Sequence, residues 1–112
     1  MYLGMTQAQA DATGWRGIDQ GSKLAGSANL WTDGVLDQNA NFGTSGFSAL
    51  PGGNRYGSDG SFYSLGSYGY WWSSTEYDGS YAWCRYLSYY DAGVYRDYRS
   101  KRTGFSVRCL RD

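Results

Sequence analysis

Aromatic residues take the place of aliphatic ones in this chain, and this feature limits its possible folds more than any other. Of the 112 residues, 12 are Tyr and 5 are Trp, whereas only 16 are Leu, Ile, Val or Phe. So low a count of these four residue types is typical of disordered chains. The Tyr and Trp rings nevertheless offer large apolar surfaces, and the net charge of zero removes self-repulsion. We therefore expect one compact domain over residues 1–112, with a core built largely from rings.

The second half of the chain alternates short aromatic segments with turns rich in Gly, Ser and Asp, which is the pattern of antiparallel strands. Strands are expected over residues 46–50, 61–65, 70–74, 81–88, 94–99 and 104–110. Alternation in the last strand turns Phe105, Val107 and Cys109 inward, and Trp71 and Trp72 complete the expected core. The predicted fold class is α+β, mostly antiparallel β, with long ordered loops.

The first half holds one helical candidate and many glycines. Thr6 is a suitable cap for a short helix over residues 7–10, and Gly14 can stop it. Residues 14–45 are predicted to form an irregular but ordered loop. Five apolar side chains are expected to anchor this loop: Trp15, Leu24, Leu30, Trp31 and Phe42.

Composition excludes most catalytic and cofactor chemistry. The chain has no His and two Cys, so it lacks a Ser-His-Asp triad, a Cys-His pair and the usual zinc ligands. Asp59 and Asp78 each precede Gly and are predicted to be turn residues rather than calcium ligands. We expect no metal, no cofactor and no catalysis. No apolar run suits a membrane span or a signal segment in this chain, and the neutral charge argues against nucleic acid.

The segment 77–99 is the strongest candidate for binding. It holds seven Tyr, three Asp, two Ser and three Arg, the mixture that antibody loops use for recognition. A monomer has no folding reason to place so many Tyr around the turn 88–93, although any single Tyr ring could simply fill the core. The predicted ligand-binding residues are Tyr77, Asp78, Tyr81, Trp83, Tyr89, Tyr90, Tyr95, Asp97, Tyr98 and Arg99.

Three blocks of sequence carry a resemblance to a known family. They read GFSALPGGNR at 46–55, GYWWSSTE at 69–76 and GFSVRCLRD at 104–112. Together they resemble the Fibrobacter succinogenes major paralogous domain, a family of bacterial surface or secreted proteins. The resemblance implies a C-type-lectin-like fold, related to formylglycine-generating enzymes and to the variable proteins of diversity-generating retroelements. It also implies an extracellular or cell-surface location.

The resemblance also predicts a missing element. In that family an N-terminal strand and helix precede the segment with which this chain begins, and their absence would expose a strand edge. Two explanations are open. Either residues 1–112 are the C-terminal part or a minimal version of a larger fold, or another copy covers the edge in a homo-oligomer.

The resemblance therefore implies a non-catalytic ligand-binding or display domain with a protein or glycan ligand. Retroelement mutagenesis converts Asn codons to a limited set of residues, and every residue from 77 to 99 except Trp83 lies in that set. The window is either diversified in this way or fixed for one ligand. A self-associating adhesive protein is a further alternative.

An enzyme related to the formylglycine-generating enzymes is the weakest alternative. Those enzymes use a close pair of thiols, whereas Cys84 and Cys109 lie 25 positions apart. A disulfide between these two Cys and two reduced thiols are both open, and we favour reduced thiols. The only proline, Pro51, lies in a Leu-Pro-Gly-Gly turn, unlike the loop of calcium-dependent lectins.

Overall fold

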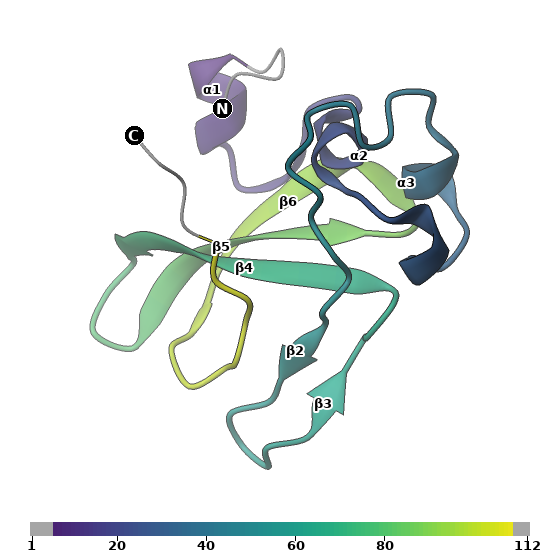
Figure 1. Cartoon of the computed structure of the whole chain (residues 1–112). Helices are drawn as coiled ribbons and strands as arrows, with labels where there is room; N and C mark the ends of the chain where they lie inside the picture. Colours follow the sequence, from purple (N-terminus) through teal and green to yellow (C-terminus); the bar gives the residue numbers. More distant parts are fainter. Residues whose placement is uncertain (1–5, 109–112) are drawn as a thin grey trace.

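A four-stranded antiparallel sheet forms the centre of the computed structural model, which describes residues 6–108 (Figure 1). Its strand order is β1-β6-β5-β4. The four strands are β1 (Gly14–Arg16), β4 (Tyr68–Glu76), β5 (Tyr81–Ser88) and β6 (Asp91–Ser100). The predicted strands 81–88, 94–99 and 70–74 are confirmed, and the mostly antiparallel architecture is confirmed with them.

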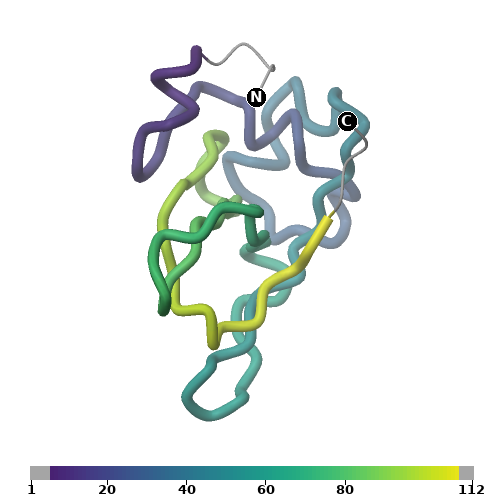
Figure 2. Tube along the Cα trace, turned by 90° about the vertical axis from the view of Figure 1, so that its left-hand side faces the viewer, coloured from purple at the N-terminus to yellow at the C-terminus, as the bar shows by residue number. Residues whose placement is uncertain are grey.

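A second, two-stranded sheet forms a hairpin that projects from the body of the molecule (Figure 2). It pairs β2 (Asn54–Arg55) with β3 (Phe62–Tyr63). Within it, the Asp59 carboxylate accepts a hydrogen bond from the Ser61 amide at 2.9 Å. This contact confirms that Asp59 is a turn residue.

Short helices in the first half of the chain lie on one side of the large sheet (Figure 1). The first helix follows a capping box, in which Thr6 and Gln9 exchange side-chain and backbone hydrogen bonds. It confirms the predicted helix at this position. The helical segments are α1 (Gln7–Asp11), α2 (Gln20–Leu24), the 3-10 helix η1 (Ala28–Leu30) and α3 (Val35–Gln38).

The prediction of an irregular loop over residues 14–45 is wrong. This stretch contains three of those helical segments and also β1, which pairs with β6 about 80 positions later in the chain. Local patterns do not reveal such pairing, because β1 has only three residues. Of the predicted anchors, Trp31 is 4% exposed, but its neighbour Leu30 is 51% exposed.

The strands predicted over 46–50 and 104–110 are not formed in the described residues. Ala49 makes a single bridge with Ala25, and the strand cannot continue because Pro51 lacks an amide hydrogen. Residues 104–106 make only isolated bridges to Arg55 and Trp71. Val107 is 68% exposed, so its prediction as a core residue is also wrong. Cys109 lies outside the described residues.

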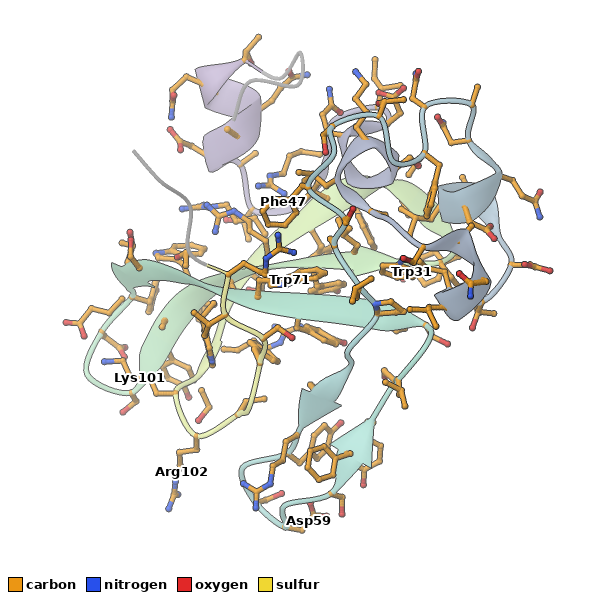
Figure 3. The ribbon with its side chains drawn as sticks, viewed as in Figure 1. Trp31, Phe47, Asp59, Trp71, Lys101 and Arg102 are labelled. Atoms are coloured by element: carbon orange, nitrogen blue, oxygen red, sulfur yellow. The ribbon has the colours of Figure 1, made fainter. Side chains whose placement is uncertain are left out.

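The hydrophobic core lies between one face of the large sheet and the helical half of the chain. Trp31, Phe47 and Trp71 lie in this region (Figure 3). The Trp31 indole also donates a hydrogen bond to the Gly26 carbonyl at 3.1 Å. The buried members are Ala25, Trp31, Leu36, Ala49, Leu87 and Val94, with Leu24, Phe42, Phe47 and Trp71 packed against them.

Candidate functional site

A row of aromatic side chains crosses the sheet face that is turned away from this core. Leu87 and Val94 face the core, so strand alternation turns Tyr86 and Tyr95 to the opposite face. The strand register continues this row across all four strands, because it pairs Trp15 with Tyr95, Tyr95 with Tyr86 and Tyr86 with Tyr70. Phe105 adds a fifth ring beyond β4. We call these five residues the aromatic ladder: Trp15, Tyr95, Tyr86, Tyr70 and Phe105.

The rings of the aromatic ladder contact one another from one end to the other. Their centroids are 5.1 Å apart between Trp15 and Tyr95, and 4.5 Å apart between Tyr95 and Tyr86. The row continues at 4.9 Å from Tyr86 to Tyr70 and at 4.8 Å from Tyr70 to Phe105. Such cross-strand aromatic pairs stabilise a sheet and hold the rings in fixed positions. The ladder is therefore a preorganised apolar surface.

The aromatic ladder is partly open to solvent. Each of its five side chains is half-buried, and none belongs to the core cluster. Tyr90 extends the surface at one end, where it contacts Trp15 at 5.9 Å and is itself 48% exposed. Contiguous apolar surface of this kind commonly marks a site of interaction.

Polar groups border the aromatic ladder. Asp97 and Arg99 lie on the same face of β6 as Tyr95 and form an ion pair. A recess of about 380 Å³, which shares no residue with the aromatic ladder, opens separately between the hairpin and the turn that follows β6. It is lined by Tyr56, Gly57, Ser58, Ser100, Arg102 and Thr103. An apolar centre with a polar border is the usual composition of a recognition surface.

A second group of aromatic residues lies on the opposite face of the sheet, near the start of β5 and the end of β6. Tyr77 and Tyr98 stack with ring centroids 4.0 Å apart, and Trp83 lies 5.5 Å from each of them. Tyr81 contacts Tyr98 at 5.9 Å. We call Tyr77, Tyr81, Trp83 and Tyr98 the distal cluster. Its three Tyr side chains are all exposed.

The ten residues predicted from the sequence therefore do not form one surface. Four of them make up the distal cluster, and Tyr90, Tyr95, Asp97 and Arg99 lie at the aromatic ladder. Asp78 accepts hydrogen bonds from the Ser80 and Tyr81 amides, which confirms its predicted role in a turn. The Tyr89 carbonyl accepts a bond from the Leu36 amide and so positions α3.

Sequence reasoning missed several residues of the ladder face. The sequence pattern predicts Trp15 as the anchor of a loop, and it predicts core positions for Trp71 and Trp72 but no role for Tyr70. Tyr86 belongs to the 77–99 window but was not selected. Alternation along β5 would have separated Tyr86 from Trp83, since they lie on opposite faces. The pairing of Trp15 with Tyr95 has no local signal in the sequence.

Cys84 has the character of a structural thiol. It is a free, fully buried cysteine on the ladder face of β5, and burial raises its pKa to about 11. At neutral pH the thiol is therefore protonated, whereas nucleophilic cysteines act as thiolates. Within residues 6–108, no group of three His, Cys, Asp or Glu side chains is placed to share a metal ion.

We expect the protein to lose stability as the pH rises above about 10, the ordinary pKa of Tyr. Burial, followed by the neighbouring Tyr68 and Tyr95 respectively, raises the pKa of Tyr70 and of Tyr86. Both phenols stay protonated in the folded chain while the same groups ionise in the unfolded chain. Their stabilising contribution is complete below pH 10 and is lost as the pH passes through the raised pKa values.

Urea unfolding between pH 8 and 11.5 measures this effect. The matched variant carries Tyr70→Phe and Tyr86→Phe, which keep the rings but remove both titrating groups. Its stability should fall less steeply than that of the wild type above pH 10. Parallel curves for the two proteins would mean that these two phenols do not cause the loss.

Comparison with known proteins gives one match. The model of a family described as the Fibrobacter succinogenes major domain matches residues 1–111. No curated protein and no solved structure matches the chain. Among the described residues, no helix has both the length and the apolar character needed to cross a bilayer.

Proposed function

Because the chain belongs to the Fibrobacter succinogenes major domain family, we propose that it is a non-catalytic ligand-binding or display domain of a bacterial or phage surface protein. The aromatic ladder is its recognition surface. The observation that carries this proposal is a row of five contacting rings, spread over five chain segments, on a sheet face outside the core. Tyr and Trp are favoured at binding hot spots, since they give large contact areas at low entropic cost.

The fold within this proposal is C-type-lectin-like. Its support is a central antiparallel sheet with short helices and long ordered loops around it, together with the three sequence blocks of the family. A location outside the cell or at its surface belongs to the same proposal. The buried, protonated thiol of Cys84 supports the absence of thiol-based catalysis.

The ligand in this proposal is a protein or a glycan. Aromatic side chains bind both classes, because a ring packs against apolar side chains and against the apolar face of a sugar. Neither case requires a metal ion. The ion pair of Asp97 and Arg99 at the border adds polar contacts that can orient the ligand.

Arrays of glycans and of bacterial surface proteins, probed with the folded domain, test this function. Tyr90→Ala on the ladder face should weaken binding about tenfold, as removal of an aromatic hot-spot residue does. Phe62→Ala is the control, because Phe62 is an aromatic residue that is 79% exposed and lies on the β2–β3 hairpin, outside the ladder and the distal cluster. It should leave the affinity unchanged. The opposite pattern, or an equal loss in both variants, would overturn the assignment of recognition to the ladder.

Diversification by a retroelement, if it acts on this chain, is proposed to affect only part of the 77–99 window. Cys84, Leu87, Ser88, Ala92 and Val94 are buried, and substitutions there would disturb packing. Deep sequencing of the coding locus should therefore find substitutions at exposed adenine-derived codons, with the buried positions constant. Substitutions spread evenly over buried and exposed positions would contradict this arrangement.

Self-association through the same aromatic face is the second candidate function. The observation that favours it is the apolar character of the ladder, which suits a second copy as well as a foreign ligand. Sedimentation equilibrium separates the two functions. A concentration-dependent dimer that Tyr90→Ala disrupts would favour adhesion, whereas a monomer at all concentrations would favour ligand capture.

A further inference from the structure

Three arginine side chains come together on the core-facing side of the sheet. Arg85 and Arg96 are direct partners in the register of β5 and β6, so their Cβ atoms lie about 5 Å apart. Arg16 on β1 is diagonal to Arg96, since Gly14 is the direct partner of Arg96. We call Arg16, Arg85 and Arg96 the arginine triad. Along the strands, the triad lies between the hydrophobic core and the distal cluster.

This arrangement has no evident folding benefit. Like charges placed directly opposite each other destabilise a sheet, and Arg16 is only 7% exposed. Burial, followed by Arg85 and Arg96, lowers the pKa of Arg16 to about 10. Burial and then Arg96 also lower the pKa of Arg85. The triad thus concentrates positive charge where the protein disfavours it.

The Asp11 carboxylate lies close enough to raise the pKa of Arg16 and of Arg85, but it is the smallest influence on both, and the protein supplies few direct partners for these charges. Arg16 donates to the main-chain carbonyls of Val94 and Ala10, while Arg96 donates to that of Asp11 and Arg85 to that of Cys84. All three Nε atoms are buried and have no hydrogen-bond partner in the described part of the chain. The ion pairs among residues 6–108 do not include the triad; they are Lys23–Asp19, Arg99–Asp97 and Lys101–Glu76.

The triad is also held in place by its surroundings. The Arg96 guanidinium lies 3.8 Å from the ring centroid of Trp83, a cation–π contact that fixes its plane. Its bond of 2.6 Å to the Asp11 carbonyl fixes one nitrogen. Arg16 is fixed in the same way by its bond of 2.7 Å to the Val94 carbonyl. Guanidinium groups that are oriented before binding lose less entropy when they bind an anion.

We propose that the arginine triad binds an oxyanion of the phosphate or sulfate type, contributed by a phosphorylated or sulfated ligand. Arginine forks match the spacing of oxygens in such anions and form two hydrogen bonds at once. A dianion would also remove the repulsion among the three cations. The distal cluster beside the triad offers rings on which the remainder of that ligand can pack. This site is separate from the aromatic ladder, which lies on the opposite face.

Isothermal titration calorimetry tests the site, with sodium phosphate and sodium sulfate as probes at pH 7 and sodium chloride of equal ionic strength as the background. The Arg85→Gln variant should weaken the affinity for the bound oxyanion at least tenfold. Arg55→Gln on the exposed hairpin removes the same charge outside the triad and should change the affinity less than twofold. Binding of phosphate identifies a phosphoryl group and binding of sulfate a sulfated one, and either supports the site.

A thermal-unfolding experiment separates ligand binding from a structural role of Arg85. In chloride alone, Arg85→Gln should unfold at the same temperature as the wild type or higher, because the substitution relieves repulsion. In phosphate or sulfate the order should reverse. Arg96→Gln, with the same expected loss of affinity, serves if Arg85→Gln does not fold. The proposal is wrong if neither oxyanion binds more tightly than chloride, or if Arg85→Gln retains wild-type affinity.

Discussion

Replacing Trp31 with Ala is expected to lower the free energy of unfolding by about 3–5 kcal/mol, the usual range for a buried Trp. Trp31 is 4% exposed and packs in a core where Ala25 and Ala49 are also members. Such small neighbours cannot move in to fill the space of an indole. The substitution also removes the donor to the Gly26 carbonyl. Since small domains are stable by only about 5–15 kcal/mol, this loss is a large fraction of the total.

Urea unfolding followed by circular dichroism measures this loss. Leu30→Ala is the matched control, because Leu30 is adjacent in sequence but 51% exposed. It should change the free energy of unfolding by no more than about 0.5 kcal/mol. Trp31→Phe should fall between the two, since it keeps a ring but loses the hydrogen bond. Equal costs at positions 30 and 31 would mean that the core does not lie where the structure places it.

The parts of the fold that could be predicted from the sequence are those with local signals. The strands β4, β5 and β6 alternate in residue type, and Asp78-Gly79 specifies the turn between the first two. The helix α1 has its Thr6 cap. In each case a few neighbouring residues decide the conformation, so no knowledge of distant partners is needed.

The parts of the fold that could not be predicted from the sequence depend on contacts with residues far away in the chain. Leu30 and Trp31 are both apolar and adjacent, and only the path of the chain decides that one is buried. The single bridges made by Ala49 and Ser106 come from segments that resemble strands but find no continuous partner. Sheet register is set by pairing across the whole chain and is not written in one segment.

Only part of the candidate site could be predicted, because strand membership has local sequence signals and the register between strands does not. The sequence identified Tyr95 and Tyr98 in the right strand, but alternation alone would have separated them into opposite faces. The aromatic ladder needed the register between strands, which places Trp15 beside Tyr95. The arginine triad needed the same information. Only the pairing of β5 with β6 brings Arg85 opposite Arg96.

Replacing Gly21 with Ala is expected to destabilise the protein by about 3 kcal/mol, at the upper end of the cost of overpacking. Gly21 lies in α2, which packs directly on β6. A Cβ atom there would overlap the Gly93 carbonyl oxygen and would lie 2.8 Å from that of Ala92. These are main-chain atoms of a central strand and cannot rotate away. The helix would have to move, together with Ser22, whose hydroxyl donates to the Leu36 carbonyl.

Helix propensity alone predicts the opposite sign, because Ala is favoured over Gly in a helix by about 1 kcal/mol. The measured sign therefore decides between local preference and the close approach of α2 to β6. Gly79→Ala is the control, since a Cβ atom there meets nothing within 4 Å, and its effect should stay within about 0.5 kcal/mol. A stabilised Gly21→Ala variant would mean that α2 does not contact β6 at this distance. A destabilised variant would show that α2 packs on the main chain of β6 as closely as the structure places it.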